Sequence, residues 1–489
     1  MNWLDRHADG LLPIAVMSIS ALILYGYDIG FKALGPSEAY SALAAGQPTL
    51  GAVAHTAMES DPGKPVLYHL LLHWFCEWFG GSETTLRSFS LIFGVASVAL
   101  VFAYGDDLFN HRVGMVAAAI WALSPLAIVC ARWARMYSMF VALALGHLLL
   151  MAKLRRRSTV IITVAAGTLG AAMLYTHLAA IFIICAELVV VVREFRREGR
   201  SVTLLPLILA VLLFVPFVPS AVAQSHALLF GHWLDWIGVS HSSGSVRILV
   251  GSITAALILW LSLGCRGISD ASEFLLRCSL IAAIPLLALT AGSVVIRPMF
   301  SIRYAAPSFA VAAVIIARLL DHRAPRVRKD ITVSIITLLV VLLPLSYMAQ
   351  EQPWREIARQ IASAGAERET IFFETGFFSP ERAIDQQQNE GFPNGFFQVP
   401  FKYYFKQPNP NESVPGDNPA RARELIEAAV RKTGGAWLIS GKSRANAVAE
   451  LPSGELFQTD LEQDFSRVLV LHVRMLSRTP DKSQTRRDR

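Results

Sequence analysis

The sequence predicts a polytopic α-helical membrane protein with a small α/β domain on its outer side. The 489 residues are 54% hydrophobic and only 17% charged, and the mean hydropathy is +0.45. This balance is too apolar for a soluble domain. Apolar stretches long enough to cross a bilayer as helices recur up to residue 350. Beyond that residue, short strand and helix patterns replace them.

The first apolar run, residues 11–27, contains no charged residue and is not followed by a small-residue cleavage site. We therefore interpret it as a retained span rather than a signal peptide. The pattern predicts about eleven spans in all. The others are expected near 88–105, 114–131, 137–152, 159–175, 178–193, 203–222, 246–264, 274–295, 304–320 and 331–349.

The basic loops predict the orientation. When the spans alternate, one side receives 111–112, 153–157, 193–200, 266 and 321–329. Lys and Arg concentrate in cytoplasmic loops, so this side and the N-terminus are expected inside. The opposite side then receives 28–87, 132–136, 176–177, 223–245, 296–303 and everything after 350.

One apolar stretch, "PVLYHLLLHWFCEWFG" at 65–80, would break this alternation if it crossed the membrane. It is short, rich in aromatic residues, and interrupted by His69, His73 and Glu77. A helix of this composition is better suited to lie in the membrane interface. The first outer loop is therefore expected to hold two surface-lying helices, at about 37–45 and 65–79.

The region after residue 350 alternates helix and strand patterns. Residues 352–365 and 418–434 have helical periodicity, whereas 369–376 and 435–441 resemble short strands. This alternation predicts an α/β domain over 351–480, after a transmembrane module over 1–350. The polar end, 481–489, is expected to be a disordered basic tail.

Composition argues against several functional classes. The five cysteines lie in or beside apolar segments without a CxxC motif, so neither a disulfide framework nor a thiolate metal site is indicated. No basic stretch is interleaved with aromatic residues, so nucleic acid is not an expected partner. His69 and His73 have the i,i+4 spacing of a metal pair, but no third ligand is evident, and no cofactor is predicted.

Ionisable residues gather at the predicted outer ends of spans, where such groups are costly and often functional. The acids are Asp28, Glu38, Glu59 and Asp61. The arginines are Arg132, Arg135, Arg297 and Arg303. The planar donors of arginine suit a lipid phosphate or diphosphate; alternatively, the arginines pair with headgroups or acids. His177 at another outer end fits a catalytic role or an interfacial, hydrogen-bonded one.

Five stretches in this order carry a resemblance to a known family. They are "SEAYSALAAG" (37–46), "DPGKPVLYHLLLHWFCEWFGGSETTLRSFS" (61–90), "CARWARMYSMFVALAL" (130–145), "LYTHLAA" (174–180) and "SIRYAAP" (301–307). The sequence resembles bacterial GT-C superfamily glycosyltransferases similar to glycosyltransferase family 39. That group includes protein O-mannosyltransferases, the lipid A aminoarabinose transferase and the lipopolysaccharide-core transferases of rhizobia.

The resemblance implies a helical bundle whose first outer loop forms two interfacial helices over the active site. It implies transfer of a sugar from a polyprenyl-phosphate carrier, with inversion of the anomeric carbon, to an extracytoplasmic glycan, lipid or protein acceptor. The implied location is the bacterial inner membrane, with the active site on the periplasmic face.

The resemblance also implies roles for single residues. Glu38 falls on the glutamate of the family's "Asp-Glu" pair, and Asp61, Lys64 and Tyr68 fall on a "D-x-x-(H/K)-P-P-L-Y" stretch in which Val66 replaces the second proline. The "ARMY" and "RY-x-x-P" motifs place Arg135, Tyr137, Arg303 and Tyr304. We expect Glu38 and Asp61 to be catalytic. Substrate binding is expected of these lysine, tyrosine and arginine residues together with Arg132, His177 and Arg297.

One position departs from the family pattern. Ser37 occupies the place of the aspartate usually taken as the base, and a serine cannot act as a carboxylate base. Either Glu38 or Asp61 has assumed that role, or the acceptor chemistry differs, or transfer activity has been lost. A transporter or flippase of lipid-linked sugars is the rival from another class. It would need polar residues deep in several spans, where Glu187 is the main candidate.

Overall fold

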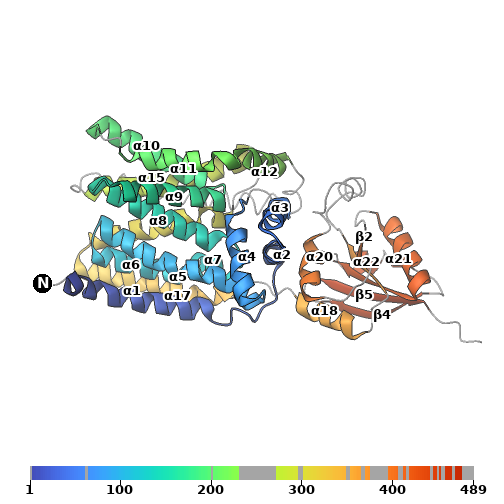
Figure 1. Ribbon diagram of the computed structural model, residues 1–489. Coiled ribbons are helices and arrows are strands. Elements are labelled where there is room, and N and C mark those ends of the chain that lie inside the picture. The colour runs from blue at the N-terminus through green and yellow to red at the C-terminus, as the bar shows by residue number, and fades with distance from the viewer. Residues whose placement is uncertain are drawn as a thin grey trace, which may run out of the picture. The chain divides into compact units, whose positions relative to one another are not determined.

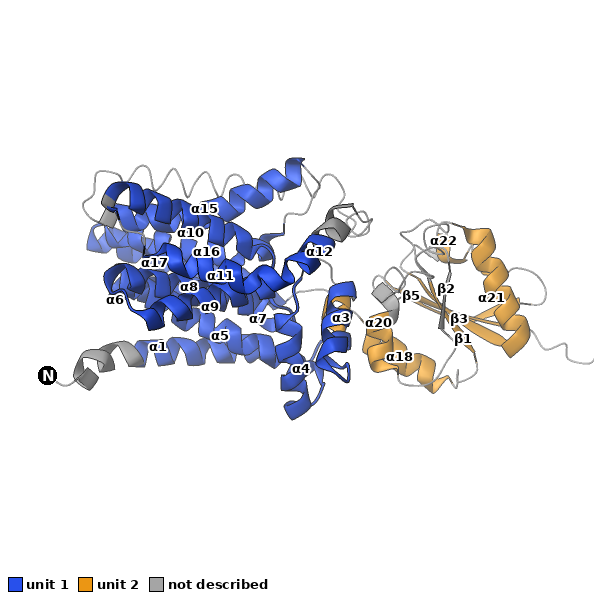
Figure 2. Cartoon of the chain, turned by 45° about the horizontal axis from the view of Figure 1, so that its top comes forward, with its two compact units in different colours: residues 1–32, 40–350 blue, residues 33–39, 351–489 orange. Residues whose placement is uncertain are grey.

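The computed structural model describes residues 3–60, 64–199, 202–230, 271–295, 301–347, 353–364, 369–374, 395–405, 411–414, 418–440, 444–448, 451–452, 457–464 and 468–475. It divides into two compact units, coloured separately in Figure 2. Unit 1 comprises residues 1–32 and 40–350, and unit 2 comprises 33–39 and 351–489. The predicted span 246–264, the tail 481–489, Asp61 and Arg297 lie outside the described residues.

Unit 1 is a bundle of helices that run side by side (Figure 1). Its long elements are α1 (Trp3–Gly26), α5 (Glu83–Leu108), α6 (His111–Leu123), α7 (Pro125–Arg132), α8 (Tyr137–Arg156), α9 (Val160–Thr176), α10 (Ala180–Glu198), α11 (Leu204–Phe214), α12 (Val218–Phe230), α15 (Ala271–Val295), α16 (Ala306–Asp321) and α17 (Pro325–Tyr347). Two short 3-10 helices, η1 (Val215–Phe217) and η2 (Ile302–Ala305), adjoin α12 and α16. In the described part of the chain, six helices are long and apolar enough to cross a membrane.

The predicted span 114–131 is not one straight helix. It consists of α6 and α7, which meet at an angle of 62°. The break falls at Ser124 and Pro125, and proline is favoured at the first position of a helix because it has no N–H to donate. A single apolar run therefore forms a bent pair, and α7 leads directly into the "ARWARMY" motif.

The first outer loop forms α2 (Pro36–Ala45), α3 (Leu50–Ser60) and α4 (Leu67–Phe79). The helices predicted at 37–45 and 65–79 are confirmed as α2 and α4, whereas α3 was not predicted. Figure 1 shows α3 and α4 lying across one end of the bundle rather than along it. Tyr68, His69, Leu72 and His73 form the buried face of α4.

Close packing between α5 and α7 depends on a glycine. A Cβ atom added at Gly94 would lie 2.3 Å from the Cβ of Ala131 and 3.2 Å from its Cα. Real Cβ atoms do not approach so closely, so only glycine permits this separation of the helices. The position of α7, and of the residues that follow it, is thus fixed by contact with α5.

Buried ion pairs connect α8, α10 and α15. Arg155 of α8 donates to Glu187 at 2.9 Å and to Glu194 at 2.8 Å, and Arg277 of α15 approaches Glu194 at 3.2 Å. The Glu187 side chain has no exposed surface. We call these four residues the ion-pair network. Each charge has an opposite partner, which is the usual condition for burying a charge.

Unit 2 contains a five-stranded sheet with strand order β2-β1-β3-β5-β4. The strands are β1 (Thr370–Glu374), β2 (Asn411–Val414), β3 (Gly435–Ser440), β4 (Phe457–Asp464) and β5 (Leu469–Met475). The β1 strand pairs in parallel with β2 and β3, while β5 is antiparallel to β3 and β4. The helices are α18 (Trp354–Ser363), α20 (Gly395–Tyr404), α21 (Pro419–Thr433) and α22 (Arg444–Val448). The predicted strands β1 and β3 and helices α18 and α21 are confirmed, whereas β2, β4 and β5 were not predicted.

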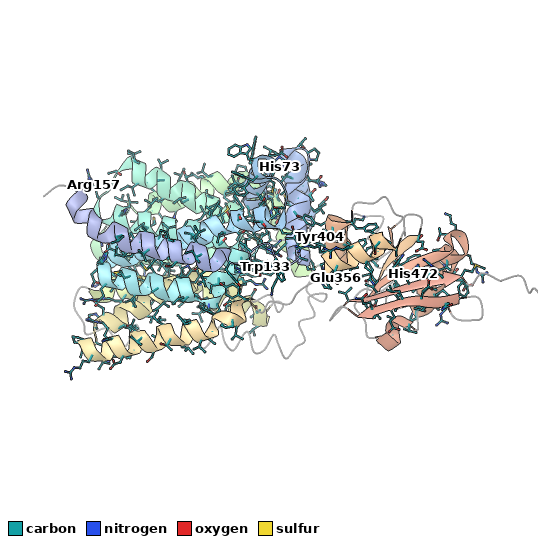
Figure 3. All side chains as sticks on the ribbon, turned by 90° about the horizontal axis from the view of Figure 1, so that it is seen from below. His73, Trp133, Arg157, Glu356, Tyr404 and His472 are labelled. Carbon is teal, nitrogen blue, oxygen red and sulfur yellow. The ribbon has the colours of Figure 1, made fainter. Side chains whose placement is uncertain are left out.

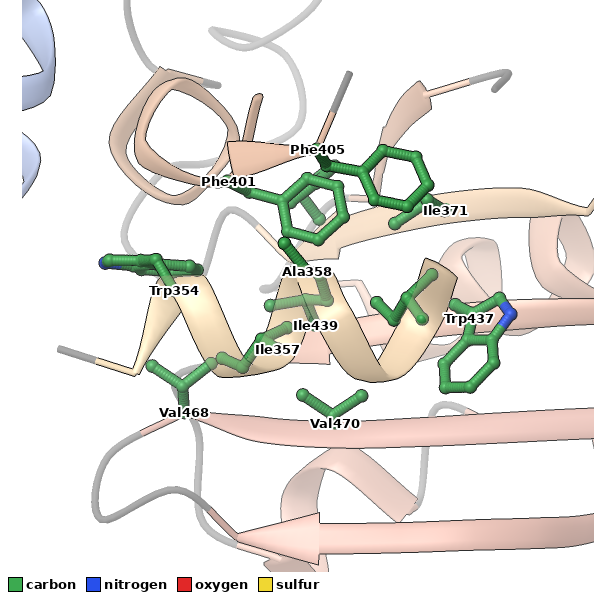
Figure 4. Close-up of a cluster of buried hydrophobic side chains, with 12 residues drawn as sticks. Trp354, Ile357, Ala358, Ile371, Phe401, Phe405, Trp437, Ile439, Val468 and Val470 are labelled. Atoms are coloured by element: carbon green, nitrogen blue, oxygen red, sulfur yellow. The ribbon is translucent and has the colours of Figure 1, made fainter. Parts of the chain in front are cut away.

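The sheet has a hydrophobic core on each face, because neighbouring side chains of a strand point to opposite sides. Trp437 and Ile439 of β3 pack with Trp354 of α18 and Phe401 of α20, as Figure 4 shows. Leu438, between them in the sequence, packs on the other face in a cluster with residues of α21. Unit 2 therefore has its own core on both sides of the sheet.

A histidine of β5 joins two carboxylates in unit 2. The Nε2 atom of His472 lies 2.9 Å from Glu369, and its Nδ1 atom lies 3.5 Å from Asp460. The Trp437 ring stacks on His472 at 4.2 Å and donates its N–H to Glu369 at 2.7 Å. Partial burial alone would raise the pKa of Glu369, but the hydrogen bond and charge of His472, helped by Trp437, lower this pKa below its ordinary value.

Candidate functional site

Glu38 lies in the first turn of α2 and has a structural contact of its own. Its Oε2 atom accepts a hydrogen bond from the backbone N–H of Gly35 at 3.0 Å. Gly35 precedes the first helical residue, and a glutamate that reaches back to this N–H forms half of a capping box. The side chain is only 2% exposed. The helix end therefore accounts for a glutamate here even before any catalytic role is considered.

The structure brings four of the predicted site residues of unit 1 together around aromatic rings. Tyr304, in η2, stacks on Tyr137 at a centroid distance of 6.1 Å and lies 4.8 Å from His177. The Nζ atom of Lys64 lies 5.4 Å above the Tyr304 ring. These residues come from the start of α8, the end of α9, η2 and the segment before α4.

Arg303 joins the same group through ring faces. Its guanidinium carbon lies 4.2 Å from the centroid of Trp133 and 5.6 Å from that of Tyr137. In the part of the chain that the structure describes, no carboxylate pairs with Arg303. We call Lys64, Trp133, Tyr137, His177, Arg303 and Tyr304 the aromatic–cation cluster. An arginine that stacks on rings keeps its edge N–H groups directed away from them.

Arg135 and Tyr68 share a support on α5. The Ser90 hydroxyl lies 2.8 Å from the Tyr68 hydroxyl and donates to the Arg135 carbonyl at 3.1 Å. Ser138 in turn donates to the Ser90 carbonyl at 2.7 Å. The Arg135 side chain is buried and donates to Ser41 of α2 at 3.4 Å. Ser41 is one helical turn beyond Glu38, so the two share a face of α2.

Arg132 lies in a different environment from Arg135. It donates to the carbonyl of Tyr25 at 2.9 Å and to that of Tyr27, at the end of α1. Its guanidinium also lies 4.5 Å from the Tyr347 ring. A cation at the C-terminus of a helix satisfies carbonyls that have no helical partner. The contacts of Arg132 are thus those of a helix cap.

The histidine pair of α4 is engaged locally. His73, labelled in Figure 3, has its Nδ1 atom 2.8 Å from the carbonyl of Ala45 at the end of α2. His69 is buried against Tyr68. Among the described residues, no three His, Cys, Asp or Glu side chains are grouped as metal ligands would be.

Sequence reasoning missed two of the aromatic residues and the serine support. Trp133 lies inside the quoted "CARWARMY" motif, and its spacing from Arg135 gives no sign of its contact with Arg303. Phe140 stacks on His177 at 5.3 Å with an angle of 15° between the rings. Ser90 ends the quoted 61–90 stretch, but a serine in an apolar helix carries no distinct signal.

The comparisons with known proteins agree with this architecture. Residues 63–222 match the sequence profile described as "Dolichyl-phosphate-mannose-protein mannosyltransferase". The structure is similar to that of ArnT from Cupriavidus metallidurans in the apo state, with a TM-score of 0.61 and 14% identity over 95% of this chain and 98% of that chain. The chain has the GT-C fold.

Other GT-C structures are similar as well. ArnT from Cupriavidus metallidurans bound to undecaprenyl phosphate gives a TM-score of 0.61 at 13% identity, over 95% of this chain and 98% of that chain. The apo oligosaccharyltransferase of Archaeoglobus fulgidus gives 0.53 at 11% identity, over 90% and 70% of the two chains. No curated protein matches the sequence. At such identities the likeness establishes the GT-C fold, and the apolar helices of the described residues fit a multi-pass membrane protein.

Proposed function

We propose that this GT-C protein is a membrane glycosyltransferase that moves a sugar from a polyprenyl-phosphate carrier to an extracytoplasmic glycan, lipid or protein. The observation that carries the proposal is the contact of Arg303 with the ring faces of Trp133 and Tyr137, beside Lys64, which lies 5.4 Å from the Tyr304 ring. Ring faces hold a cation in place without cancelling its charge. The aromatic–cation cluster is therefore suited to an anionic ligand.

The chemistry of the donor fits this arrangement. When the sugar leaves its carrier, negative charge develops on the carrier phosphate. Arginine binds two phosphate oxygens at once, and lysine adds a second charge. Cations placed in advance stabilise such charge in the transition state more than in the ground state. Arg303 and Lys64 thus take the role of leaving-group stabilisers, and Arg135 is a further candidate.

The structures of similar fold support the donor class. ArnT from Cupriavidus metallidurans has been solved with undecaprenyl phosphate. The Archaeoglobus fulgidus oligosaccharyltransferase has been solved with a tethered acceptor peptide. We extend a lipid-phosphate donor to this chain because the contacts of Arg303 and Lys64 with aromatic rings suit an anionic ligand.

The proton of the acceptor hydroxyl requires a base. Ser37 cannot supply a carboxylate, so we assign the role to Glu38 or Asp61. The backbone N–H of Gly35 holds the Glu38 carboxylate in one orientation at 3.0 Å. General-base removal slows reactions by roughly 10²–10⁴-fold. Glu38→Gln and Asp61→Asn compared with Ser37→Ala therefore separate the candidates.

We propose the bacterial inner membrane as the location, with the active site on the periplasmic side. The basic loops support this orientation. Reporter fusions at about residues 198, 326 and 400 should report inside, inside and outside. A cytoplasmic signal at 400 contradicts the proposed orientation.

The direct experiment measures transfer from radiolabelled polyprenyl-phosphate sugar by the purified chain in liposomes. Arg303→Met and Lys64→Met should each weaken donor use by about tenfold or more, since a hydrogen bond to a charged group contributes about 1.5–3 kcal/mol. Arg112→Met, which alters an exposed ion pair with Asp321 at 3.5 Å, is the matched control. Normal donor use in both cluster variants contradicts the phosphate assignment.

The same preparation separates the rival functions. A transporter would move the intact lipid-linked sugar between leaflets without consuming it, and an inactive homologue would do neither. In the described bundle, Glu187 is paired with Arg155 rather than directed to a substrate path. This pairing favours the transferase.

A further inference from the structure

Seven residues that lead into α2 and form its first turn group with unit 2 rather than with the helical bundle. They are residues 33–39, which include Ser37 and Glu38. We propose that Tyr404 of α20 is a positioning residue for Glu38, so that unit 2 controls the candidate base. This inference rests on the proposed function for its effect on transfer, but the anchoring contact is testable without it.

Tyr404 holds the backbone directly before the capping box. The N–H of Leu34 donates to the Tyr404 hydroxyl at 2.7 Å. The next N–H along the chain, that of Gly35, donates to the Glu38 carboxylate at 3.0 Å. The Gly35 carbonyl accepts from the N–H groups of Glu38 at 3.0 Å and Ala39 at 2.9 Å. Two successive amides are thus fixed, one by unit 2 and one by Glu38 itself.

The Tyr404 hydroxyl is held in place by the core of unit 2. Phe401 and Phe405, on either side of Tyr404 along the chain, are buried in the core with Trp354, and the Tyr404 ring packs against that core. Arg355 of α18 lies 5.8 Å from the Tyr404 ring. This packing restricts the orientation of the half-buried ring, so its oxygen is a positioned acceptor. Tyr404 is labelled in Figure 3.

Loss of the hydroxyl has a specific local consequence. Leu34 is fully buried, and a buried N–H without a partner is unfavourable. The 33–39 segment then shifts or opens to reach water, and the Gly35 amide that orients Glu38 moves with it. A small misplacement of a catalytic group slows the chemical step more than it weakens substrate binding.

Tyr404→Phe tests this contact because it removes one oxygen and keeps the ring. Hydrogen exchange of the Leu34 and Gly35 amides should become about tenfold faster, as expected for the loss of one hydrogen bond. The kcat for transfer should fall roughly threefold to tenfold while the KM for the lipid donor stays nearly constant. Tyr175→Phe is the control, because its hydroxyl donates to the Leu213 carbonyl at 3.2 Å within the bundle.

Each other outcome overturns a stated part of the proposal. Unchanged exchange at Leu34 and Gly35 in Tyr404→Phe overturns the anchor. Faster exchange with an unchanged kcat overturns the positioning role. Equally faster exchange in β3 and β5 shows general destabilisation of unit 2 and overturns a local role. If the unaltered chain transfers no sugar, the proposed function fails, and the exchange measurement alone decides whether Tyr404 anchors the segment.

Discussion

Arg155 and Arg303 belong to the same bundle but are held in opposite ways. Arg155 lies between the carboxylates of Glu187 and Glu194, at 2.9 and 2.8 Å. Arg303 lies against the rings of Trp133 and Tyr137. Carboxylates cancel the charge of the first, whereas rings leave the charge of the second available. The type of partner, rather than burial or position near a helix end, separates a structural arginine from one suited to an anion.

The largest effect is expected from breaking the ion-pair network. Glu187→Ala leaves Arg155 with one carboxylate in an apolar surrounding, and removal of one partner of a buried pair costs about 3–5 kcal/mol. Thermal unfolding in detergent should show this loss, while the transfer rate per folded molecule stays unchanged. Arg155→Met combined with Glu187→Met should recover part of the stability, because no charge is then left unpaired. Equal stability of the single and double variants contradicts this account.

A second test concerns His472, which contacts both a ring, that of Trp437, and carboxylates, those of Glu369 and Asp460. The substitution is made at Glu369. Glu369→Gln should lower the free energy of unfolding of unit 2 by about 1.5 kcal/mol at neutral pH, the lower end for a hydrogen bond to a charged group. The lowered pKa of Glu369 means that its contribution is complete above the pKa of the unfolded carboxyl, about 4.3. It is lost as the pH falls through the lower pKa of the folded state.

Pulse proteolysis of the full chain in urea between pH 7 and pH 3 measures this difference. The unaltered chain and Glu369→Gln should converge in acid, because the protonated carboxyl resembles the amide. A difference that persists unchanged at pH 3 shows that the charge of Glu369 is not responsible. Glu427→Gln, which alters an exposed pair with Arg431 on α21, is the control.

A smaller effect is expected from changing the ring contact of Arg303. Trp133→Leu removes the ring nearest to Arg303, and a cation–ring contact contributes about 1 kcal/mol. Donor binding should weaken by about fivefold, while the fold remains intact. Trp133→Phe should retain much of the affinity. Trp78→Leu, at an exposed tryptophan of α4, is the matched control. Equal loss in Trp133→Phe and Trp133→Leu contradicts a role for the ring face.

The smallest effect on donor binding is expected at Ser90, whose contacts are neutral. Ser90→Ala removes the bonds to Tyr68 and to the Arg135 carbonyl, each contributing about 0.5–1.5 kcal/mol. A modest loss of thermal stability should accompany a small rise in KM for the donor. Ser97→Ala, on the same helix and bonded to Trp121 at 2.9 Å, controls for the loss of a buried hydroxyl. If Ser90→Ala weakens donor binding more than Trp133→Leu does, the expected order of these two effects is wrong.

The sequence predicted the helices that have strong local patterns. The α4 helix was recognised because His69, His73 and Glu77 interrupt an apolar run that is too short to cross a membrane. The α3 helix was not recognised, because residues 50–60 mix small, polar and apolar side chains without a clear period. It packs on α4, so its helical form depends on a neighbour.

Motifs predicted which single residues belong to the candidate site. They did not predict the roles that depend on contacts between distant parts of the chain. Lys64, Tyr137 and Tyr304 come from motifs, and the structure places them together. Arg132 and Arg135 lie in one motif with the same charge, yet α7 ends at the first, and its side chain caps α1. Nothing in the local sequence distinguishes the two arginines, because their different environments depend on where the backbone of the folded chain places each side chain.

The environment of Glu38 shows a further limit. Its spacing from Gly35 fits a capping box, which is a local pattern and was available in the sequence. The grouping of residues 33–39 with unit 2 could not be predicted from the sequence, because it depends on a contact with α20, far along the chain. Long-range contacts of this kind leave no periodicity to detect.

The glycine at position 94 acts at a distance from the residues whose placement it determines. A single methyl group there would collide with Ala131 at 2.3 Å and force α7 outward. Trp133, two residues beyond Ala131, would move with it, and the ring that supports Arg303 would withdraw without any change to the ring itself. The closeness of one helix contact thus sets where the ring of Trp133 lies beside Arg303.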